Sequence, residues 1–278
     1  MTSATALHLP AAFARVDRDD GFVAVRRGWE EAFGRMDDEY PDRYVEQAVR
    51  TAGATPRRGV GLRIPLKGRR DDRGVVRFFR RGGWVRWLGP YYFHATERFL
   101  EELQIAEDLV ERGIPTAEIL LLRVRRHRMA WTSAYLVTRE ITGTRDLWGA
   151  WSEAGEGFGA RLNRLQEGIL DEAARFVATL HDAGLEHPDL NLRNILVRGR
   201  PGKREYFVLD LDRARVGESL GGAERWKQLR RLYRSFEKLR AGHGVSLGPE
   251  ARARFLRAYL SGRAPSPAWD QAARRCRA

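Results

Sequence analysis

The sequence has 278 residues, of which 43% are hydrophobic, and it carries a formal net charge of +13. This length allows one large domain or two lobes, and the hydrophobic content excludes an intrinsically disordered chain. The only cysteine is Cys276, so we expect no internal disulfide. No apolar run reaches the roughly 18 residues that a membrane span needs, and no charged start precedes an apolar core at the N-terminus, so we expect a cytoplasmic protein.

The positive charge is concentrated in two parts of the chain. Residues 57–86 hold eleven Lys or Arg against two Asp, and "ERWKQLRRLYRSFEKLR" (residues 224–240) places basic residues at helical spacing. This charge predicts an anionic partner, which is nucleic acid, a phosphorylated substrate or an anionic membrane. Only four of the 50 basic residues are lysines. The alternative is therefore that a coding bias toward arginine produces the positive charge, and that the charged surface is solvated and has no special function.

The first half of the chain is predicted to be rich in strands. Residues 21–33 read as a strand and a helix, and residues 37–53 as a helix that ends at Gly53. Two β-prone runs, "GVGLRIPL" and "GVVRFFR", flank a polar turn and predict a hairpin. A helix is predicted in "TERFLEELQIAEDLVERGIP" (residues 96–115), where Gly113 and Pro115 end it. Two more β-prone runs follow, "AEILLLRVRR" and "WTSAYLVTREI".

The second half is predicted to be mostly helical. "RLNRLQEGILDEAARFVATLHDAG" (residues 161–184) is a long amphipathic helix, followed by the polar stretch "HPDLNLRNIL" and the strand "YFVLDLD". The order predicts an α+β protein of two lobes, with residues 1–140 as a β-rich N-lobe and residues 141–278 as a helical C-lobe. A cleft between the lobes is the expected ligand site.

The polar stretch has the composition of a phosphoryl-transfer site. Asp189 and Asn194 lie five residues apart in a loop, and Asp210 ends the strand "YFVLD" sixteen residues later. Phosphoryl transfer needs a carboxylate for the acceptor hydroxyl and oxygen ligands for Mg²⁺, which takes few protein ligands beside the substrate phosphates. The alternative for His187 and Asn191 is that they only satisfy backbone groups of the loop.

The motifs "HPDLNLRNIL" and "LDLD" resemble the catalytic and metal motifs of the protein-kinase-like superfamily. The segments "VVRFFRRGGW", "TERFLEELQIAEDLVERGIPTAE", "LDLDRAR" and "WKQLRRLYRSFEKL" resemble, more narrowly, the kinases of 3-deoxy-D-manno-octulosonic acid (Kdo) within the lipopolysaccharide kinase group. The resemblance covers residues 57–240. It implies a protein-kinase-like two-lobed fold that uses ATP and Mg²⁺.

The resemblance also implies roles for individual residues. Asp189 would orient the acceptor hydroxyl and take its proton, while His187 would orient the catalytic loop through hydrogen bonds. Asn194 and Asp210 would bind Mg²⁺. Asp212 either joins them or pairs with an arginine. Glu102 would pair with a basic residue of the preceding strand.

That basic residue is expected to be Arg77, where protein kinases have a lysine, and Lys67 is the rival candidate. An arginine can hold phosphates and a carboxylate through its planar fork, although it is not equivalent to lysine. Gly59 and Gly61 could let backbone N–H groups approach the ATP phosphates, and an ordinary turn into a strand explains them almost as well.

The resemblance implies an ATP-dependent sugar kinase that phosphorylates Kdo, at its 4-hydroxyl, in the lipopolysaccharide inner core. The acceptor would be a Kdo-bearing lipid A precursor, and the enzyme would be peripheral on the cytoplasmic face of the bacterial inner membrane. Residues 57–86 and 226–240 would dock on that anionic surface, together with aromatic residues that fit a core equally well (Trp84, Trp87, Tyr91, Tyr92 and Phe93). No segment closes with Ala-Pro-Glu after "LDLDRAR", which indicates a small or lipid-linked acceptor.

Two alternatives stay open from the sequence. The first keeps the fold and changes the acceptor to a heptose or another small molecule. The second is a basic, kinase-like pseudoenzyme that binds nucleic acid, but no nucleic-acid-binding motif is visible and we expect no such partner. RNA binding with steep salt dependence, without ATP turnover, would identify the second.

Overall fold

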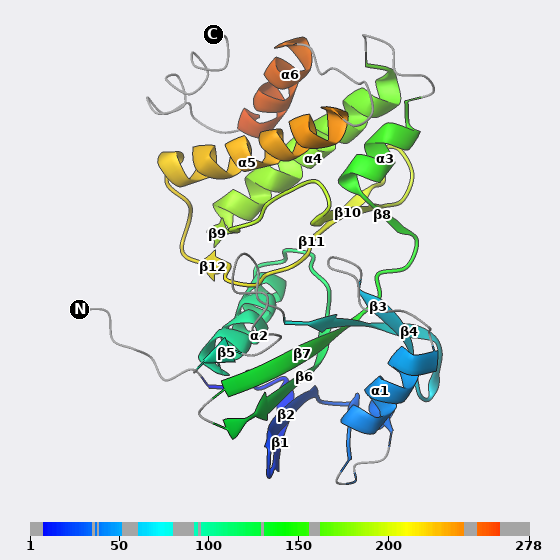
Figure 1. The fold of residues 1–278 in the computed structure, drawn as a ribbon. Helices are drawn as coiled ribbons and strands as arrows, with labels where there is room; N and C mark the ends of the chain where they lie inside the picture. The colour runs from blue at the N-terminus through cyan, green and yellow to red at the C-terminus, as the bar shows by residue number, and fades with distance from the viewer. Residues whose placement is uncertain are drawn as a thin grey trace, which may run out of the picture. The chain divides into compact units, whose positions relative to one another are not determined.

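The computed structural model describes residues 8–34, 37, 39–51, 61–79, 92–93, 96–128, 131–155, 162–241 and 249–261. The chain forms two compact units (Figure 1). The first unit comprises Met1–Glu107 and Ala117–Ile141, and the second comprises Asp108–Thr116 and Thr142–Ala278. The predicted α+β class is confirmed, since strands dominate the first unit and helices dominate the second.

The first unit is built on an antiparallel sheet in the order β1-β2-β6-β7-β4-β3, with β5 paired to β7. Its strands are β1 (Phe13–Arg18), β2 (Gly21–Arg26), β3 (Leu62–Leu66), β4 (Arg69–Phe78), β5 (Tyr92–Phe93), β6 (Ile119–Arg126) and β7 (Trp131–Arg139). Its helices are the 3-10 helix η1 (Glu30–Phe33), α1 (Asp42–Thr51) and most of α2 (Thr96–Glu111). Both predicted hairpins, β3–β4 and β6–β7, are present.

Alternation along β4 directs its side chains to two different helices. Val76 and Phe78 pack in the core that α1 and η1 share with the sheet. The intervening Arg77 and the following Phe79 contact α2 instead, and the Phe79 ring lies 4.5 Å from that of Phe99. Because successive strand residues point to opposite faces of a sheet, Arg77 contacts α2, whereas its neighbours Val76 and Phe78 face the other side.

The first fifty residues extend this sheet and anchor α1. The hairpin of β1 and β2 adds two strands beside β6. The buried guanidinium of Arg123 on β6 binds Asp42, the first residue of α1, at 2.9 Å and also Asp20 at 2.5 Å. The Tyr135 hydroxyl donates to Asp42 at 2.9 Å. A buried charge needs such partners, so α1 is held on the sheet by its first residue.

The C-terminus of α2 is closed by a Schellman motif. Gly113 has φ +71°, its N–H donates to the carbonyl of Val110, and the N–H of Ile114 donates to the carbonyl of Leu109. Glycine adopts this backbone conformation without the strain that a Cβ would add. The helix therefore ends where the sequence predicts.

The second unit consists of four helices and two small sheets. The helices are α3 (Leu147–Glu153), α4 (Arg164–Asp182), α5 (Gly222–Ala241) and α6 (Pro249–Leu260). One sheet has the order β11-β10-β8 and the other pairs β12 with β9. These strands are β8 (Thr144–Asp146), β9 (Leu185–Glu186), β10 (Ile195–Arg198), β11 (Glu205–Val208) and β12 (Arg215–Val216).

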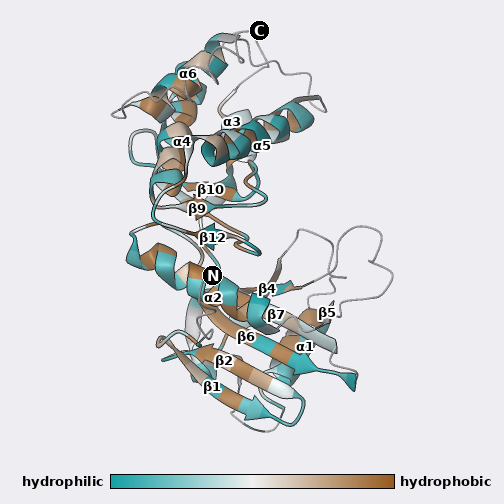
Figure 2. Ribbon diagram, turned by 90° about the vertical axis from the view of Figure 1, so that its left-hand side faces the viewer, coloured by the Kyte–Doolittle hydropathy of each residue, from teal (hydrophilic) through white to brown (hydrophobic). Residues whose placement is uncertain are grey.

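Helix α4 begins with a capping box and ends directly before the polar loop. The Asn163 side chain accepts from the Gln166 N–H at 2.9 Å, and the Gln166 side chain accepts from the Asn163 N–H at 3.2 Å. Its buried face includes Ile169, Ala173 and Val177. Figure 2 shows the contrast between the hydrophobic residues of β2 and β6 and the largely hydrophilic visible side of α5.

Candidate active site

The polar loop lies between two strands of the second unit. It leaves β9 at Glu186 and enters β10 at Ile195. Gly184, just before β9, has φ +77°, and a Cβ there would lie 2.3 Å from the Gly217 carbonyl oxygen. The same carbonyl accepts from Arg112, and the Gly217 N–H donates to the Gly184 carbonyl. The start of the loop is therefore fixed by close backbone packing.

His187 is fully buried and bonds the loop on both sides of its ring. Its Nδ1 accepts from the Asp189 N–H at 3.1 Å, which assigns the ring hydrogen to Nε2, and Nε2 donates to the Leu209 carbonyl at 2.9 Å. Burial lowers the pKa of the imidazole below 6.5, although the Leu209 carbonyl and the nearby Asp210 carboxylate favour the charged form. A neutral His187 thus links Asp189 to the segment that carries Asp210.

Two asparagine side chains fold the loop around the backbone of Asp189. Asn191 and Asn194 each donate an Nδ2 hydrogen to the Asp189 carbonyl, at 3.0 and 2.9 Å. The Asn191 Oδ1 also accepts from the N–H groups of Arg193 and Asn194. Asn191 therefore forms hydrogen bonds with backbone groups of the loop, as the alternative interpretation of this residue predicts. The exposed Asp189 carboxylate projects from a backbone that is bonded on both sides.

Asn194 and Asp210, the predicted magnesium ligands, come from adjacent segments. The Leu209 N–H donates to the Asn194 carbonyl at 2.9 Å, which places Asp210 one residue from that contact. The strand β11 ends at Val208, so the prediction that Asp210 ends it is wrong by two residues. Asp210 has φ +59°, a left-handed conformation that a strand cannot contain. Asp212, two residues later, is half-buried.

The donor set fits magnesium. Within the described ranges, no three His, Cys, Asp or Glu side chains gather as a metal group. Mg²⁺ does not require such a group, because it takes one or two carboxylates beside phosphate oxygens and waters. Nδ2 of Asn194 donates to Asp189, which leaves the amide Oδ1 as the ligand atom that this residue can offer. Asn194 and Asp210 thus supply two hard oxygen donors.

Two residues of α5 support the loop, although no motif in the sequence marks them. Gln228 is buried; its Oε1 accepts from the His187 N–H at 3.0 Å and its Nε2 donates to the Leu185 carbonyl at 3.2 Å. Ser235, two turns later, accepts from the Leu192 N–H at 3.3 Å. One pattern in the sequence could have indicated them. The two polar residues are seven positions apart, on the helix face that also bears the buried Leu229, Leu232 and Phe236.

The first unit brings Arg77 of β4 and Glu102 of α2 into contact. An Arg77 nitrogen donates to Oε1 of Glu102, and the side chains are 31% and 5% exposed. The Arg77 guanidinium also lies over the Phe79 ring, 4.7 Å from its centroid. Lys67 lies in the turn between β3 and β4, above the Tyr44 ring. Arg77, rather than Lys67, thus forms a described ion pair with Glu102, and its role with ATP stays a prediction.

The predicted phosphate loop is described only in part. Gly59 lies outside the described residues, as do Trp84, Trp87 and Tyr91. Gly61 directly precedes β3, and a Cβ there would lie 2.1 Å from a methyl group of Val75. Close packing of the hairpin therefore explains a glycine at position 61, as the alternative interpretation holds.

Comparison with known proteins identifies the family of the chain. Residues 61–259 match the model of the lipopolysaccharide kinase (Kdo/WaaP) family. The chain is 27% identical over 216 residues to 3-deoxy-D-manno-octulosonic acid kinase of Vibrio cholerae, covering 75% of this chain and 83% of that protein. It is 30% identical over 189 residues to the kinase of the same name from Stenotrophomonas maltophilia K279a, covering 66% and 70%.

A solved structure described as WaaP in complex with acyl carrier protein has a similar fold. Its TM-score is 0.58 at 20% identity, and the match covers 92% of this chain and 98% of that one. At this identity the match shows the fold alone. The family match spans most of the chain and includes both the Arg77–Glu102 pair and the loop around Asp189. The chain therefore belongs to the lipopolysaccharide kinase (Kdo/WaaP) family and is a sugar phosphotransferase.

Proposed function

We propose that the chain transfers the γ-phosphoryl group of ATP to the 4-hydroxyl of Kdo on a Kdo-bearing lipid A precursor. The observation that carries the proposal is the loop from His187 to Asn194, which holds Asp189 and Asn194 beside the segment leading to Asp210. The curated relatives are Kdo kinases, which favours Kdo over a heptose or another small acceptor. Family membership favours an enzyme over a nucleic-acid-binding pseudoenzyme.

In the proposed reaction, Asp189 accepts the proton of the sugar hydroxyl while the hydroxyl oxygen forms a bond to the γ-phosphorus. The bond between that phosphorus and the bridging oxygen of ADP breaks, and ADP leaves. Alignment provides most of the catalysis in such a transfer, since the transition state is loose and its charge lies on phosphate oxygens. His187 contributes by holding the backbone of Asp189 in place, and its lowered pKa keeps it neutral at pH 7.

Asn194 and Asp210 would hold Mg²⁺, with Asp212 as a further candidate. Bound Mg²⁺ neutralises phosphate charge in this chemistry. In the first unit, Arg77 would bind the ATP phosphates while Glu102 fixes its guanidinium. Arginine suits this role because its planar fork can bind a carboxylate and an oxyanion together.

The chain would bind its lipid acceptor at the cytoplasmic face of the inner membrane. Four exposed cations of α5 recur every three or four residues, and no described acidic side chain forms an ion pair with them: Lys227, Arg230, Arg234 and Lys238. Such a row is attracted to anionic lipid headgroups. None of the described helices is both long and apolar enough to span a membrane. Peripheral attachment through α5 is the proposed arrangement.

Phosphate transfer from labelled ATP to a Kdo-bearing lipid A precursor, in the presence of Mg²⁺, tests the proposal. The unaltered chain is compared with Asp189→Ala, which is exposed and should fold normally. We expect transfer to fall by at least about a hundredfold in the variant, the lower range for loss of a proton-accepting group. The exposed Asp182→Ala on α4 is the matched control, and its thermal stability is measured alongside.

Each outcome has a definite meaning. Transfer by the unaltered chain and by Asp182→Ala, but not by Asp189→Ala, supports both the acceptor and the role of Asp189. ATP binding without transfer to this lipid would refute Kdo as the acceptor and direct the search to other core sugars. Equal transfer by both variants would remove Asp189 from the mechanism.

A further inference from the structure

An exposed arginine lies in the loop of Asp189 without a role in the proposed reaction. Arg193 comes four residues after Asp189 and directly before Asn194. Its N–H donates to Oδ1 of Asn191 at 2.9 Å, so its backbone is held together with the rest of the loop. No residue in the described ranges accepts a hydrogen bond from its guanidinium or forms an ion pair with it. The backbone of Arg193 is therefore fixed, whereas its cationic group is available to a ligand.

A second arginine faces the same loop from α5. Gln228 and Ser235 of this helix accept hydrogen bonds from backbone N–H groups of the loop. Arg231 lies three residues after Gln228 and four before Ser235, so it is on the helix face that contacts the loop. Its guanidinium likewise has no hydrogen-bond or ion-pair partner in the part of the chain that the structure describes. Two available cations thus belong to one loop and the helix that supports it.

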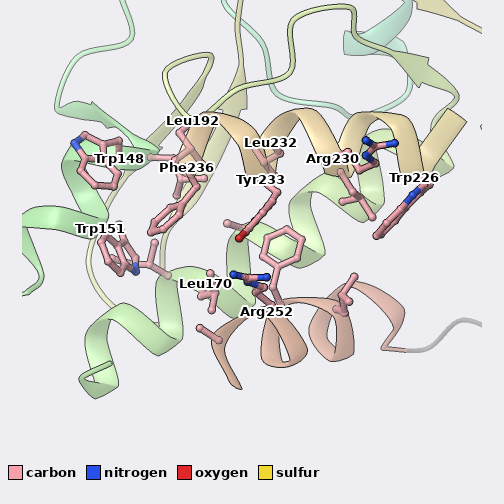
Figure 3. Close-up of a pocket in the computed structure, with 17 residues that line it drawn as sticks. Trp148, Trp151, Leu170, Leu192, Trp226, Arg230, Leu232, Tyr233, Phe236 and Arg252 are labelled. Atoms are coloured by element: carbon pink, nitrogen blue, oxygen red, sulfur yellow. The ribbon is translucent and has the colours of Figure 1, made fainter. Parts of the chain in front are cut away.

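Two further observations place the Arg231 charge at the loop. Burial is the main cause of the lowered pKa of His187, and the positive charge of Arg231 lowers this pKa further. The opposite side of α5 presents Trp226, Arg230 and Tyr233 to a hollow among the helices (Figure 3), and Arg231 is not among the residues that line it. The charge of Arg231 therefore acts on the loop side of α5.

Position distinguishes these two arginines from the exposed cations found elsewhere on the chain. The carboxylates of Asp189 and Asp210 lie in the loop and in the segment beside it, and ATP brings further negative charge. An acidic acceptor that approaches Asp189 is therefore repelled unless cations lie nearby. Two cations without partners offset this repulsion, whereas a neutral sugar would gain nothing from them.

We propose, on the basis of the proposed function, that Arg193 and Arg231 bind the carboxylate of the acceptor and so select an acidic sugar. Kdo is a sugar acid, and its carboxyl group is attached to the same ring that bears the 4-hydroxyl. The guanidinium fork of Arg193 bonds the carboxylate through parallel hydrogen bonds, while Arg231 attracts it from α5. The two arginines determine specificity, and the proton of the hydroxyl still goes to Asp189.

Phosphate transfer to two forms of the acceptor tests the proposal. One is the Kdo-bearing lipid A precursor, and the other is the same lipid with the Kdo carboxyl group as a methyl ester. Both are dispersed in neutral detergent with labelled ATP and Mg²⁺. For the unaltered chain, kcat/KM should be about ten- to a hundredfold lower with the ester, the effect of losing hydrogen bonds to a charged group. The KM for ATP should be the same with both acceptors.

Substitution of either arginine should reduce the preference for the acid. In Arg193→Gln, kcat/KM for the acid should fall about ten- to a hundredfold, to near the value that the unaltered chain has with the ester. Esterification should then cost this variant no more than about threefold, the part that Arg231 contributes as a charge without a direct bond. Arg231→Gln should reduce the preference by about the same threefold. Arg193→Lys should recover part of the preference, because lysine keeps the charge but not the fork.

Arg200→Gln is the matched control. Arg200 is an exposed arginine in the turn between β10 and β11, away from the loop of Asp189 in sequence. The variant loses the same charge and should keep both kcat/KM and the preference for the acid. Melting temperatures show whether each variant is folded, and Arg193→Gln should melt like the unaltered chain because its side chain is exposed.

Three results would overturn the proposal, and they can be told apart. No transfer to either acceptor by the unaltered chain would refute the proposed function, and the carboxylate site with it. Equal transfer to the acid and the ester would refute the carboxylate site alone and leave the proposed function intact. A higher KM for ATP in Arg193→Gln, with the preference for the acid retained, would assign this arginine to the nucleotide phosphates.

Discussion

Between His187 and Asn194, three side chains bond the backbone of their own loop. The His187 ring and the Asn191 and Asn194 amides all reach backbone groups at or beside Asp189. A loop bonded in this way is rigid before any substrate binds, and rigid placement is what an alignment-dependent reaction requires. Each of these side chains therefore affects the position of the one exposed carboxylate.

The buried His187 makes stability depend on pH in a definite direction. In the unfolded chain its pKa is near 6.5, whereas burial lowers it in the folded protein. Below pH 6.5 the unfolded state thus binds a proton that the folded state does not, and stability falls as the pH decreases toward the folded-state pKa. We expect a loss of up to about 1.4 kcal/mol per pH unit from this group.

Urea unfolding between pH 7.5 and 5 measures this dependence. His187→Gln should be less stable at pH 7.5 but should lose less stability on acidification than the unaltered chain. The exposed His127→Gln serves as the control and should keep the slope of the unaltered chain. An unchanged slope in His187→Gln would show that other groups cause the acid sensitivity.

The Arg77–Glu102 pair gives a second prediction at the level of single residues. Removing the guanidinium in Arg77→Gln takes an ion-pair partner from the carboxylate of Glu102, which is 5% exposed. We expect the free energy of unfolding to fall by about 2–3 kcal/mol, below the range for fully buried pairs because Arg77 is 31% exposed. The KM for ATP should rise, while Arg77→Lys should recover more stability than ATP affinity.

Chemical denaturation and initial rates at varied ATP concentration measure the two effects. Arg63→Gln, which removes a largely exposed partner of Glu140, is the matched control and should cost less than about 1 kcal/mol. An unchanged KM for ATP in a folded Arg77→Gln protein would exclude Arg77 from the nucleotide site.

Among the elements, α5 has two distinct faces. One face holds the loop of Asp189 through Gln228 and Ser235 and packs Leu229 and Leu232 into the core. The other exposes Lys227, Arg234 and Lys238. The helix therefore connects the outer surface of the second unit directly to the backbone of the loop that carries Asp189.

Gln228→Leu should weaken this connection. The substitution keeps the size of the side chain but leaves the His187 N–H and the Leu185 carbonyl without their partner. We expect a loss of about 2–6 kcal/mol in the free energy of unfolding, from two buried groups at about 1–3 kcal/mol each. Because the loop loses its support, kcat should fall more than the KM for ATP changes.

Denaturation and steady-state kinetics on Gln228→Leu, with the exposed Glu224→Gln as control, distinguish this from a general effect on α5. The control should keep both stability and kcat. A stable Gln228→Leu protein with normal kcat would show that the loop holds its conformation without the helix.

The sequence predicted the long elements well and the short ones poorly. The β3–β4 hairpin, α2 and α4 have clear periodicity and recognisable ends, and all three are present. Strands of two or three residues, such as β8, β9 and β12, are too short to show an alternation. The β-prone run "YFVLD" predicts Asp210 at the end of a strand, but Asp210 has a positive φ. The preceding Leu209 bonds Asn194 and His187, which lie in another part of the sequence.

The same limit applies to the candidate site. A local motif contains His187, Asp189, Asn191 and Asn194, so the sequence could identify them together. Gln228 lies 41 residues from its partner His187, and only the fold brings the two into contact. The packing of Val75 against Gly61 likewise depends on the pairing of β3 with β4, which a G-x-G pattern does not contain.

For the whole molecule, the net charge of +13 predicts reversible attachment to anionic bilayers. Co-sedimentation with phosphatidylglycerol vesicles should decrease as salt is raised, since exposed charges are screened over about 10 Å at 0.1 M ionic strength. Replacing Lys227, Arg234 and Lys238 with Gln should weaken binding by about two orders of magnitude, at about 1 kcal/mol for each cation near the surface.

The control changes three other exposed cations of the second unit, Arg175, Arg200 and Lys203, and alters the net charge equally. It should retain most of the binding if α5 is the attachment surface. Equal loss in both triple variants would indicate attraction by net charge alone, and binding to neutral phosphatidylcholine would argue against an electrostatic attachment.

The division of the chain has a practical consequence for studying the parts separately. Residues 108–116 belong to the second unit, although they precede the last two long strands of the first. Within them, Pro115 accepts from the Val208 N–H, and Arg112 donates to the carbonyls of Ala183 and Gly217. A gene fragment that begins at Thr142 would therefore lack a segment that its own strands and turns require. Expression of that fragment alone should yield a poorly folded product, and joining residues 108–116 to it through a flexible linker should restore its fold.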